Sequence, residues 1–273
     1  MKNSFGSLIP TWPTYLRIAS LFLVCCLALV LEPVGPPTES AIVPNRVVLH
    51  ASNIQPIAKF HFDGDVRNEG SGKGGCSINR REFRGDYYGA QALYLDGFYG
   101  DYKDDAVCKT PDLDYSAWTA VIRFRAEDFE PIPIPGCSQF LDRSTILVGG
   151  LSHRWFALSR SSSGNIRVTF NNHDFKRELE APIYPGLWTV VATGFDLASR
   201  KVYVYVNGLE VGKIDLPEDF NLRVIGSKAE KLDKRWYFTN YSDGTVFYGL
   251  VSDLMIYDRL LSAEDFSAIP LKP

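Results

Sequence analysis

The chain has 273 residues, enough for one large β domain or two small ones. Hydrophobic residues make up 45% of it and charged residues 22%, a globular composition that excludes a mainly disordered protein. The formal net charge of −3 offers no electrostatic footprint for nucleic acid, so we expect no nucleic-acid partner.

Residues 1–40 are predicted to be a signal peptide or an N-terminal membrane anchor. Lys2 and Arg17 are the only charges before the apolar run 18–31. That run is shorter than the roughly 20 residues that cross a bilayer, so it suits the core of a signal peptide better than a span. If it stays uncleaved, it is the only expected membrane contact. We expect an exported protein (secreted, periplasmic or at the cell surface), with a linker at 41–56.

From residue 57 onward, short β-like segments alternate with turn signals, which is typical of a β sandwich. The run 58–65 is predicted to be an opening strand closed by an Asp-Gly turn. Alternation over 118–125 predicts a long strand with one face in the core. Asn207-Gly208 follows the alternating run 201–206 and predicts a type I′ hairpin, because both central positions of that turn need positive φ. Further strands are expected at 144–148, 155–159, 165–170 and 187–195.

A strand and one short helix are predicted to close the domain. Residues 248–257 alternate between two faces, as expected of a strand. Ser262 is a suitable N-cap, and Asp265 lies three residues later, where its carboxylate can bond back to the cap or face the helix N-terminus. Phe266 and Ile269 then share one face of the helix.

These motifs, in this order, resemble a laminin-G-like domain of the concanavalin A-like lectin/glucanase superfamily. The resemblance is carried by Phe62-Asp-Gly-Asp65, the block 92–102, the Val204–Gly208 hairpin and the closing segment Tyr248–Ile269. It implies an all-β fold, namely a two-sheet antiparallel jelly-roll sandwich of concanavalin A type with one short C-terminal helix. The domain is expected to span 57–269, with a tail at 270–273.

Some relatives with this fold are glycoside hydrolases, which need two carboxylates flanking the glycosidic bond. The nearest pattern is Glu127-Asp-Phe-Glu130, but its carboxylates do not share one strand face and it runs into Pro131. We interpret it as a solvated loop. The sequence also contains no Gly-x-Ser-x-Gly motif, P-loop or dinucleotide fingerprint. The chain is therefore predicted not to be an enzyme.

The resemblance also implies a calcium ion, because domains of this family often hold one on convergent oxygen ligands. Matching the family pattern points to Asp63 and Asp65 after the first strand, Asp101 in Gly-Asp-Tyr, and Asp253 in the closing strand. Asp63 and Asp253 meet if the first and last strands are neighbours. The alternative is that Asp63 starts a turn with Gly64, Asp101 is a solvated loop residue, and Asp253 bonds to local backbone. No other cofactor is expected.

Three cysteines follow the targeting segment: Cys76, Cys108 and Cys137. An oxidising compartment favours one disulfide with one thiol left over, and the sequence does not choose among the three pairings. The alternative is three free, partly buried thiols. No cysteine or histidine pair has the spacing of zinc ligands.

Sugar sites combine aromatic faces with a few polar groups, and two clusters fit that description. Tyr203 and Tyr205 alternate with three valines that are expected to face the core. Trp236, Tyr237 and Tyr241 belong to a long segment after residue 226, and Trp236 is the first candidate for an exposed ligand contact. The alternatives are cross-strand packing for the two tyrosines and, for the second cluster, a loop pinned to the sandwich by its aromatic residues.

We therefore expect an exported, non-catalytic binding module whose partner is a carbohydrate or a surface or matrix protein. The alternative is a structural or interaction sandwich, tethered by its N-terminus, with no small-ligand site. The third hypothesis is a divergent glycoside hydrolase.

Overall fold

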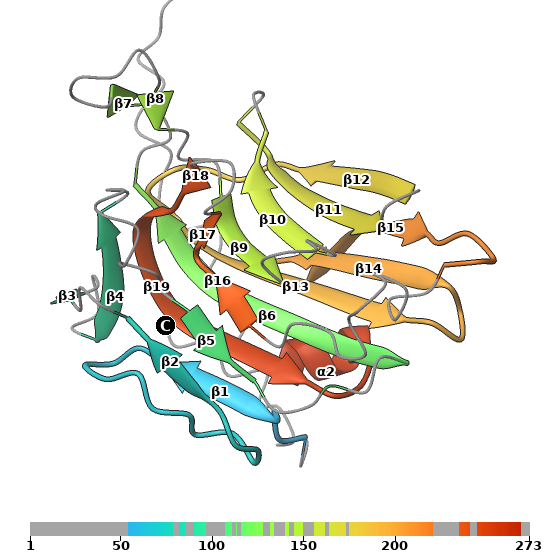
Figure 1. Cartoon of the computed structure of the whole chain (residues 1–273), viewed down its shortest axis with the longest axis horizontal. Coiled ribbons are helices and arrows are strands. Elements are labelled where there is room, and N and C mark those ends of the chain that lie inside the picture. Colours follow the sequence, from blue (N-terminus) through green and yellow to red (C-terminus); the bar gives the residue numbers. More distant parts are fainter. Residues whose placement is uncertain are drawn as a thin grey trace, which may run out of the picture. The chain divides into compact units, whose positions relative to one another are not determined.

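The computed structural model describes a β sandwich within the compact unit 49–273 (Figure 1). The described residues are 54–78, 82–85, 90–96, 107–110, 113, 116–127, 132–133, 140–141, 145–149, 156–161, 164–172, 175–220, 235–240 and 245–268. The predicted boundaries at 40 and 269 lie outside these residues, and the boundary at 56 is not tested by them. All three stay predictions.

Two large antiparallel sheets form the described domain. Sheet A has the order β15 (Leu209–Asp215), β14 (Lys201–Val206), β13 (Trp188–Asp196), β6 (Ala117–Ala126), β19 (Tyr248–Tyr257), β4 (Gln91–Asp96) and β3 (Glu82–Gly85), and β1 (Ala58–His61) also pairs with β19. Sheet B has the order β12 (Phe175–Ala181), β11 (Ile166–Asn172), β10 (Phe156–Arg160), β9 (Thr145–Gly149), β16 (Arg235–Tyr237), β5 (Val107–Lys109) and β2 (Gly75–Ser77). Two small ribbons join β7 (Ile132–Pro133) to β8 (Phe140–Leu141) and β17 (Thr239–Asn240) to β18 (Thr245–Val246). The one described helix, α2 (Ala263–Ala268), follows β19. The predicted all-β fold class is confirmed.

The core between the sheets follows the alternation of β6. Trp118, Ala120, Ile122 and Phe124 all belong to the main buried cluster, while the residues between them face away from sheet B. Trp118 is at the centre of the aromatic core, with ring-centroid distances of 5.8–5.9 Å to its neighbours. Those neighbours are Phe156, Phe170, Phe195 and Trp236. The predicted long strand is confirmed, with its predicted faces.

The hairpin between β14 and β15 also forms as predicted. Asn207 and Gly208 have φ values of 50° and 82°, the positive values that a type I′ turn requires. Figure 1 shows β19 running beside β6, and β1 beside β19, although these strands are far apart in the sequence. The first and last described strands are thus neighbours, as the calcium hypothesis assumed.

Helix α2 begins with the predicted cap. Ser262 Oγ accepts a hydrogen bond from the Asp265 amide at 3.2 Å, and the Ser262 amide donates to Asp265 Oδ2 at 2.8 Å. This reciprocal pair satisfies two backbone donors at the helix start. Phe266 then packs on Tyr205 of β14, with ring centroids 4.2 Å apart, on the outer face of sheet A, the face turned away from sheet B. Ile269 lies outside the described residues.

Replacing Ser262 by alanine is expected to lower the free energy of unfolding by about 1 kcal/mol, because the Asp265 amide loses its acceptor. Urea denaturation followed by circular dichroism measures the change. Glu218→Gln on the exposed loop after β15 is the control and is expected to stay within about 0.5 kcal/mol of wild type. Equal stability of Ser262→Ala and the control would show that the cap does not stabilise the domain.

Candidate functional site

The prediction that Trp236 is an exposed ligand contact is wrong. Its exposed fraction is 0%, and its ring lies 5.9 Å from Trp118 and 5.8 Å from Phe156 in the core between the sheets. On β16 the alternation turns this large apolar side chain inward, where burial stabilises it. The next residue, Tyr237, turns to the other face of sheet B and is also buried, against Val107. Tyr241 lies outside the described residues.

Tyr203 and Tyr205 alternate as predicted with the core residues Val202, Val204 and Val206. Tyr205 is buried beneath Phe266, and its hydroxyl lies 3.4 Å from Glu210 Oε2. Burial, assisted by the Glu210 carboxylate, raises the pKa of Tyr205 to about 12. Tyr205 therefore packs the outer face of sheet A and is not open to a ligand. Tyr203 is only half-buried, with Lys213 Nζ 5.2 Å from its ring centroid.

The arrangement around Asp253 differs from the one that the calcium hypothesis assumed. This carboxylate is buried, its Oδ1 lies 2.5 Å from His61 Nδ1, and its Oδ2 accepts a hydrogen bond from the Ser252 hydroxyl. His61 is the register partner of Asp253 across β1 and β19. Asp63, two residues further on, instead accepts a hydrogen bond from the Gln91 amide at 3.0 Å. His61 thus occupies the place opposite Asp253 that the hypothesis gave to Asp63.

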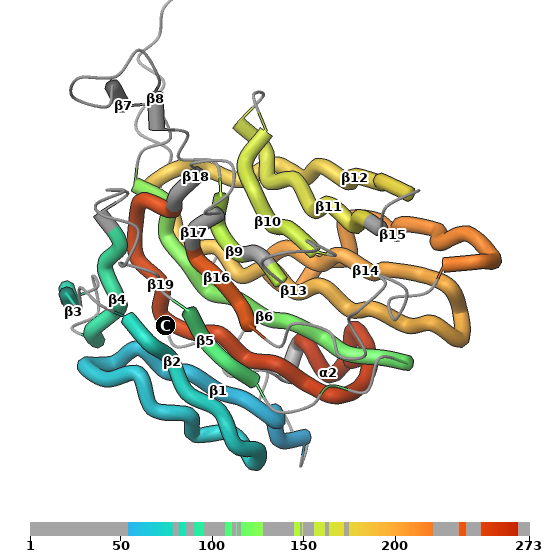
Figure 2. Tube along the Cα trace, in the orientation of Figure 1, coloured from blue at the N-terminus to red at the C-terminus, as the bar shows by residue number. Residues whose placement is uncertain are grey.

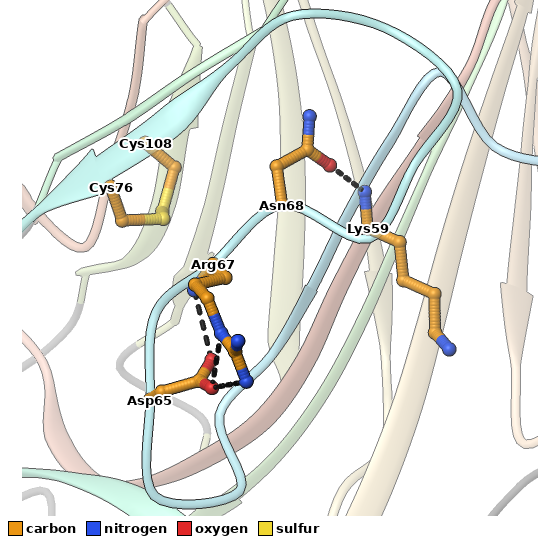
Figure 3. The surroundings of a disulfide bond; sticks show 6 residues. All are labelled: Lys59, Asp65, Arg67, Asn68, Cys76 and Cys108. Carbon is orange, nitrogen blue, oxygen red and sulfur yellow. Dashed lines mark hydrogen bonds and ion pairs between the residues drawn. A yellow bond between two sulfur atoms is a disulfide. The ribbon is translucent and has the colours of Figure 1, made fainter.

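Asp65 is also engaged. It accepts hydrogen bonds from the Arg67 backbone amide at 3.0 Å and from Arg67 Nε at 2.7 Å (Figure 3). The backbone bond, followed by the side-chain bond, lowers the pKa of Asp65. Among the described residues, no group of three or more His, Cys, Asp and Glu side chains is placed to hold a metal ion. The three described carboxylates of the predicted ligand set each have hydrogen-bond partners within the protein, and Asp101 lies outside the described residues.

Calcium binding stays a prediction that a melting scan tests. If a site exists, millimolar Ca²⁺ is expected to raise the melting temperature and a chelator to reverse the rise, because a ligand that binds only the folded state stabilises it. Magnesium at the same concentration is the control. An unchanged melting temperature in all conditions would contradict the prediction.

One of the three possible disulfides is present. Cys76 on β2 and Cys108 on β5 are register partners joined by a disulfide (Figure 3). Figure 2 traces the loop from β1 to β2 in blue and cyan. The Asn68 side chain fixes this loop: its oxygen accepts from the Lys59 amide at 2.9 Å, and its nitrogen donates to the Gly72 carbonyl at 3.0 Å. Cys137 lies outside the described residues.

The carboxylate pattern that begins at Glu127 is described only at its first residue. Arg125 donates to Glu127 Oε1 from Nε at 2.8 Å and from Nη2 at 2.5 Å. Both side chains are partly buried, with 24% and 32% exposed, and the interpretation of 127–130 as a solvated loop stays a prediction. Residues 128–131 lie outside the described residues.

The turn before β13 carries candidate residues that the sequence interpretation missed. Tyr184-Pro185-Gly186-Leu187 forms a type II turn, with Pro185 at its second position, φ of 78° at Gly186, and a 3.3 Å bond from the Leu187 amide to the Tyr184 carbonyl. Tyr184 is 70% and Leu187 60% exposed. The sequence signal for these residues is the Pro-Gly pair that stands between them. A Pro-Gly pair predicts a surface turn, and the two large apolar side chains beside it are then exposed.

This turn adjoins the Arg125–Glu127 pair. The Gly186 amide donates to the Ala126 carbonyl at 2.7 Å, between the two paired residues. Trp188, the register partner of Arg125, lies with its ring centroid 5.8 Å from the Arg125 guanidinium carbon and 4.8 Å from that of Arg123. Its Nε1 is buried and has no hydrogen-bond partner in the described part of the chain.

The β14–β15 hairpin, near this turn, also carries exposed apolar side chains. The Asn207 amide donates to the Val190 carbonyl, and the Val190 amide donates to Asn207 Oδ1, which fixes the β14–β15 hairpin near the start of β13. Leu209 on that hairpin is 73% exposed, and Val211 is also exposed. Four of the five large hydrophobic side chains that are exposed in the described structure therefore lie on the turn 184–187 and at the start of β15.

The membrane prediction falls on residues that are not described. Within the described ranges, no helix is long and apolar enough to cross a bilayer.

Comparison with solved structures supports the fold. The chain is similar to domain 4 of AbnA, a GH43 extracellular arabinanase from Geobacillus stearothermophilus solved with arabinotriose, at 18% identity and a TM-score of 0.54, over 78% of this chain and 97% of that one. It is similar to the binding domain of botulinum neurotoxin serotype D at 13% identity and a TM-score of 0.52, over 77% of this chain and 50% of that one. The support for the fold comes from these two structures. The K499G mutant of NanB sialidase from Streptococcus pneumoniae is similar at 16% identity and a TM-score of 0.49, over 81% of this chain and 29% of that one. The chain thus spans half of the neurotoxin domain and under a third of the sialidase.

Sequence comparison adds one family match. No curated protein matches the chain. Residues 138–267, just under half of the chain, match a laminin G family model described as the concanavalin A-like lectin/glucanases superfamily. The resemblance predicted from the motifs is therefore confirmed for residues 138–267, which match the concanavalin A-like lectin/glucanase model.

Proposed function

We propose that this protein is an exported, non-catalytic binding module that recognises carbohydrate. The observation that carries the proposal is the likeness to domain 4 of the arabinanase, which extends over nearly all of that domain and was solved with arabinotriose. At 18% identity the likeness concerns the fold, so the sugar class is not transferred with it.

Two features of the chain support the remaining parts of the proposal. The Cys76–Cys108 disulfide supports export, because disulfides persist in oxidising compartments. The ion pair between Glu127 and Arg125 supports a non-catalytic role, because a glycoside hydrolase needs two carboxylates that flank the glycosidic bond, whereas Glu127 is paired with a guanidinium.

A glycan array with the purified full chain tests the proposal. We expect concentration-dependent retention of a defined set of oligosaccharides, confirmed in solution by calorimetry, and no release of reducing ends during prolonged incubation. Absence of binding to every glycan at millimolar concentration would contradict carbohydrate recognition. Release of reducing ends would instead establish the glycoside hydrolase.

A second candidate function is an interaction module for a surface or matrix protein. It is favoured by the exposed aliphatic side chains Leu187, Leu209 and Val211, because clustered exposed apolar surface is typical of protein interfaces. A double variant Leu209→Ser/Val211→Ser that abolishes capture of a protein partner while leaving glycan binding intact would favour this function.

A further inference from the structure

We propose that the sugar binds over the type II turn 184–187, on the Tyr184 ring and the Arg125–Glu127 pair, and that it is a neutral oligosaccharide with vicinal hydroxyls. This inference rests on the proposed carbohydrate function and gives it a location and a ligand class. The four residues Tyr184, Arg125, Glu127 and Trp188 are called the Tyr184 site below.

The backbone of the turn that carries Tyr184 is held in one conformation. Pro185 and the positive φ of Gly186 define the turn, and the Gly186 amide ties it to the end of β6. Ile183 is buried on one side of the turn, and Trp188 is half-buried on the other. The Tyr184 ring is 70% exposed on this anchored turn, and a tyrosine loses little conformational freedom when a ligand covers it, because its side chain has only two torsions. The apolar face of a sugar ring can stack on the Tyr184 ring, because sugar sites combine aromatic faces with a few polar groups.

The polar part of the site has one hydrogen-bond donor and one acceptor that a ligand can use. Arg125 directs both Nε and Nη2 to the single oxygen Oε1 of Glu127. Nη1 of Arg125 and Oε2 of Glu127 therefore make no hydrogen bond within the described structure. Each sugar hydroxyl both donates and accepts, so two vicinal hydroxyls can bond to this donor and this acceptor together.

The charges around the site favour a neutral ligand. Arg125 is balanced by Glu127, with which it forms an ion pair. Arg123, the nearest other cation to the Trp188 ring, is the register partner of the buried carboxylate Asp253. A carboxylate or sulfate on the ligand would meet the Glu127 carboxylate without a surplus of positive charge to offset it.

Trp188 is a positioning residue in this arrangement. Its ring lies against the guanidinium groups of both Arg123 and Arg125, which limits the orientations that Arg125 can adopt. Its Nε1 is buried and lacks an acceptor among the described residues, so Trp188 contributes to the site through its ring and not through a hydrogen bond to the ligand.

The test compares matched variants of the full chain on the glycan identified by the array. Tyr184→Ala is expected to weaken binding at least about tenfold, Tyr184→Phe to retain affinity within about twofold, and Glu127→Gln to weaken it about tenfold. Leu209→Ala, which removes an equally exposed side chain from the neighbouring hairpin, is expected to leave affinity unchanged. Because Tyr184 is exposed, its variants should melt within a degree or two of wild type.

The outcomes separate the site from the function. If wild type binds a glycan while Tyr184→Ala and Glu127→Gln bind it equally well, the Tyr184 site is wrong and the carbohydrate function stands. If wild type binds no glycan, both the Tyr184 site and the carbohydrate function are wrong. A preference for uronate or sulfated glycans that weakens steeply with salt would overturn the neutral ligand class. An equal loss in Leu209→Ala would indicate a broad protein interface and would also overturn the site.

Discussion

Replacing Trp118 by alanine is expected to lower the free energy of unfolding by roughly 3–5 kcal/mol, because a fully enclosed aromatic side chain leaves a cavity that its neighbours cannot fill. Trp118 is 1% exposed and contacts aromatic rings from both sheets, including Phe195 on sheet A and Phe156 and Phe170 on sheet B. The loss therefore weakens the contact that holds the two sheets together.

Urea denaturation followed by far-ultraviolet circular dichroism measures this loss without depending on tryptophan fluorescence. Leu197→Ala is the control, since Leu197 lies on an exposed turn after β13, and its effect is expected within about 0.5 kcal/mol. If Trp118→Ala costs less than about 1 kcal/mol, the sheets do not pack around this residue as described.

Removal of the Cys76–Cys108 disulfide is expected to cost about 2–4 kcal/mol, mainly because the unfolded chain regains the freedom of the closed loop. The two cysteines are 32 residues apart in the sequence. Cys76→Ser, Cys108→Ser and the double variant should all lose the same amount, and a reducing agent should bring wild type to the same melting temperature.

Cys137→Ser is the matched control for the disulfide. It removes a thiol that is outside the described bond and is expected to leave both the melting temperature and its response to reducing agent unchanged. The reverse result, in which Cys137→Ser destabilises the protein and Cys76→Ser does not, would mean that Cys137 is paired in solution.

Local patterns explain why much of the fold could be predicted. The alternation along β6, the Asn207-Gly208 turn and the Ser262–Asp265 cap depend on neighbouring residues, and each forms as expected. The conformational preferences of these segments agree with the tertiary fold.

The candidate site could be predicted less well, because its features depend on long-range pairing. Alternation shows that Trp236 and Tyr237 face opposite ways, but only the second sheet decides which way is inward. The partner of Asp253 is His61, 192 residues away, and a shift of β1 by one residue would have changed it. The turn that carries Tyr184 is joined to β6, between Arg125 and Glu127, by one backbone hydrogen bond.

The pairing of β1 with β19 has a consequence for how this domain is combined with others. Ala58 pairs with Ile256, so the first strand begins next to the place where the last strand finishes. Domains whose ends lie close together tolerate insertion into a loop of a host protein and tolerate circular permutation. A graft of this sandwich into a host loop is therefore expected to fold if it runs from β1 through α2, which keeps the β1–β19 pairing and the Phe266 contact with Tyr205 inside the inserted segment.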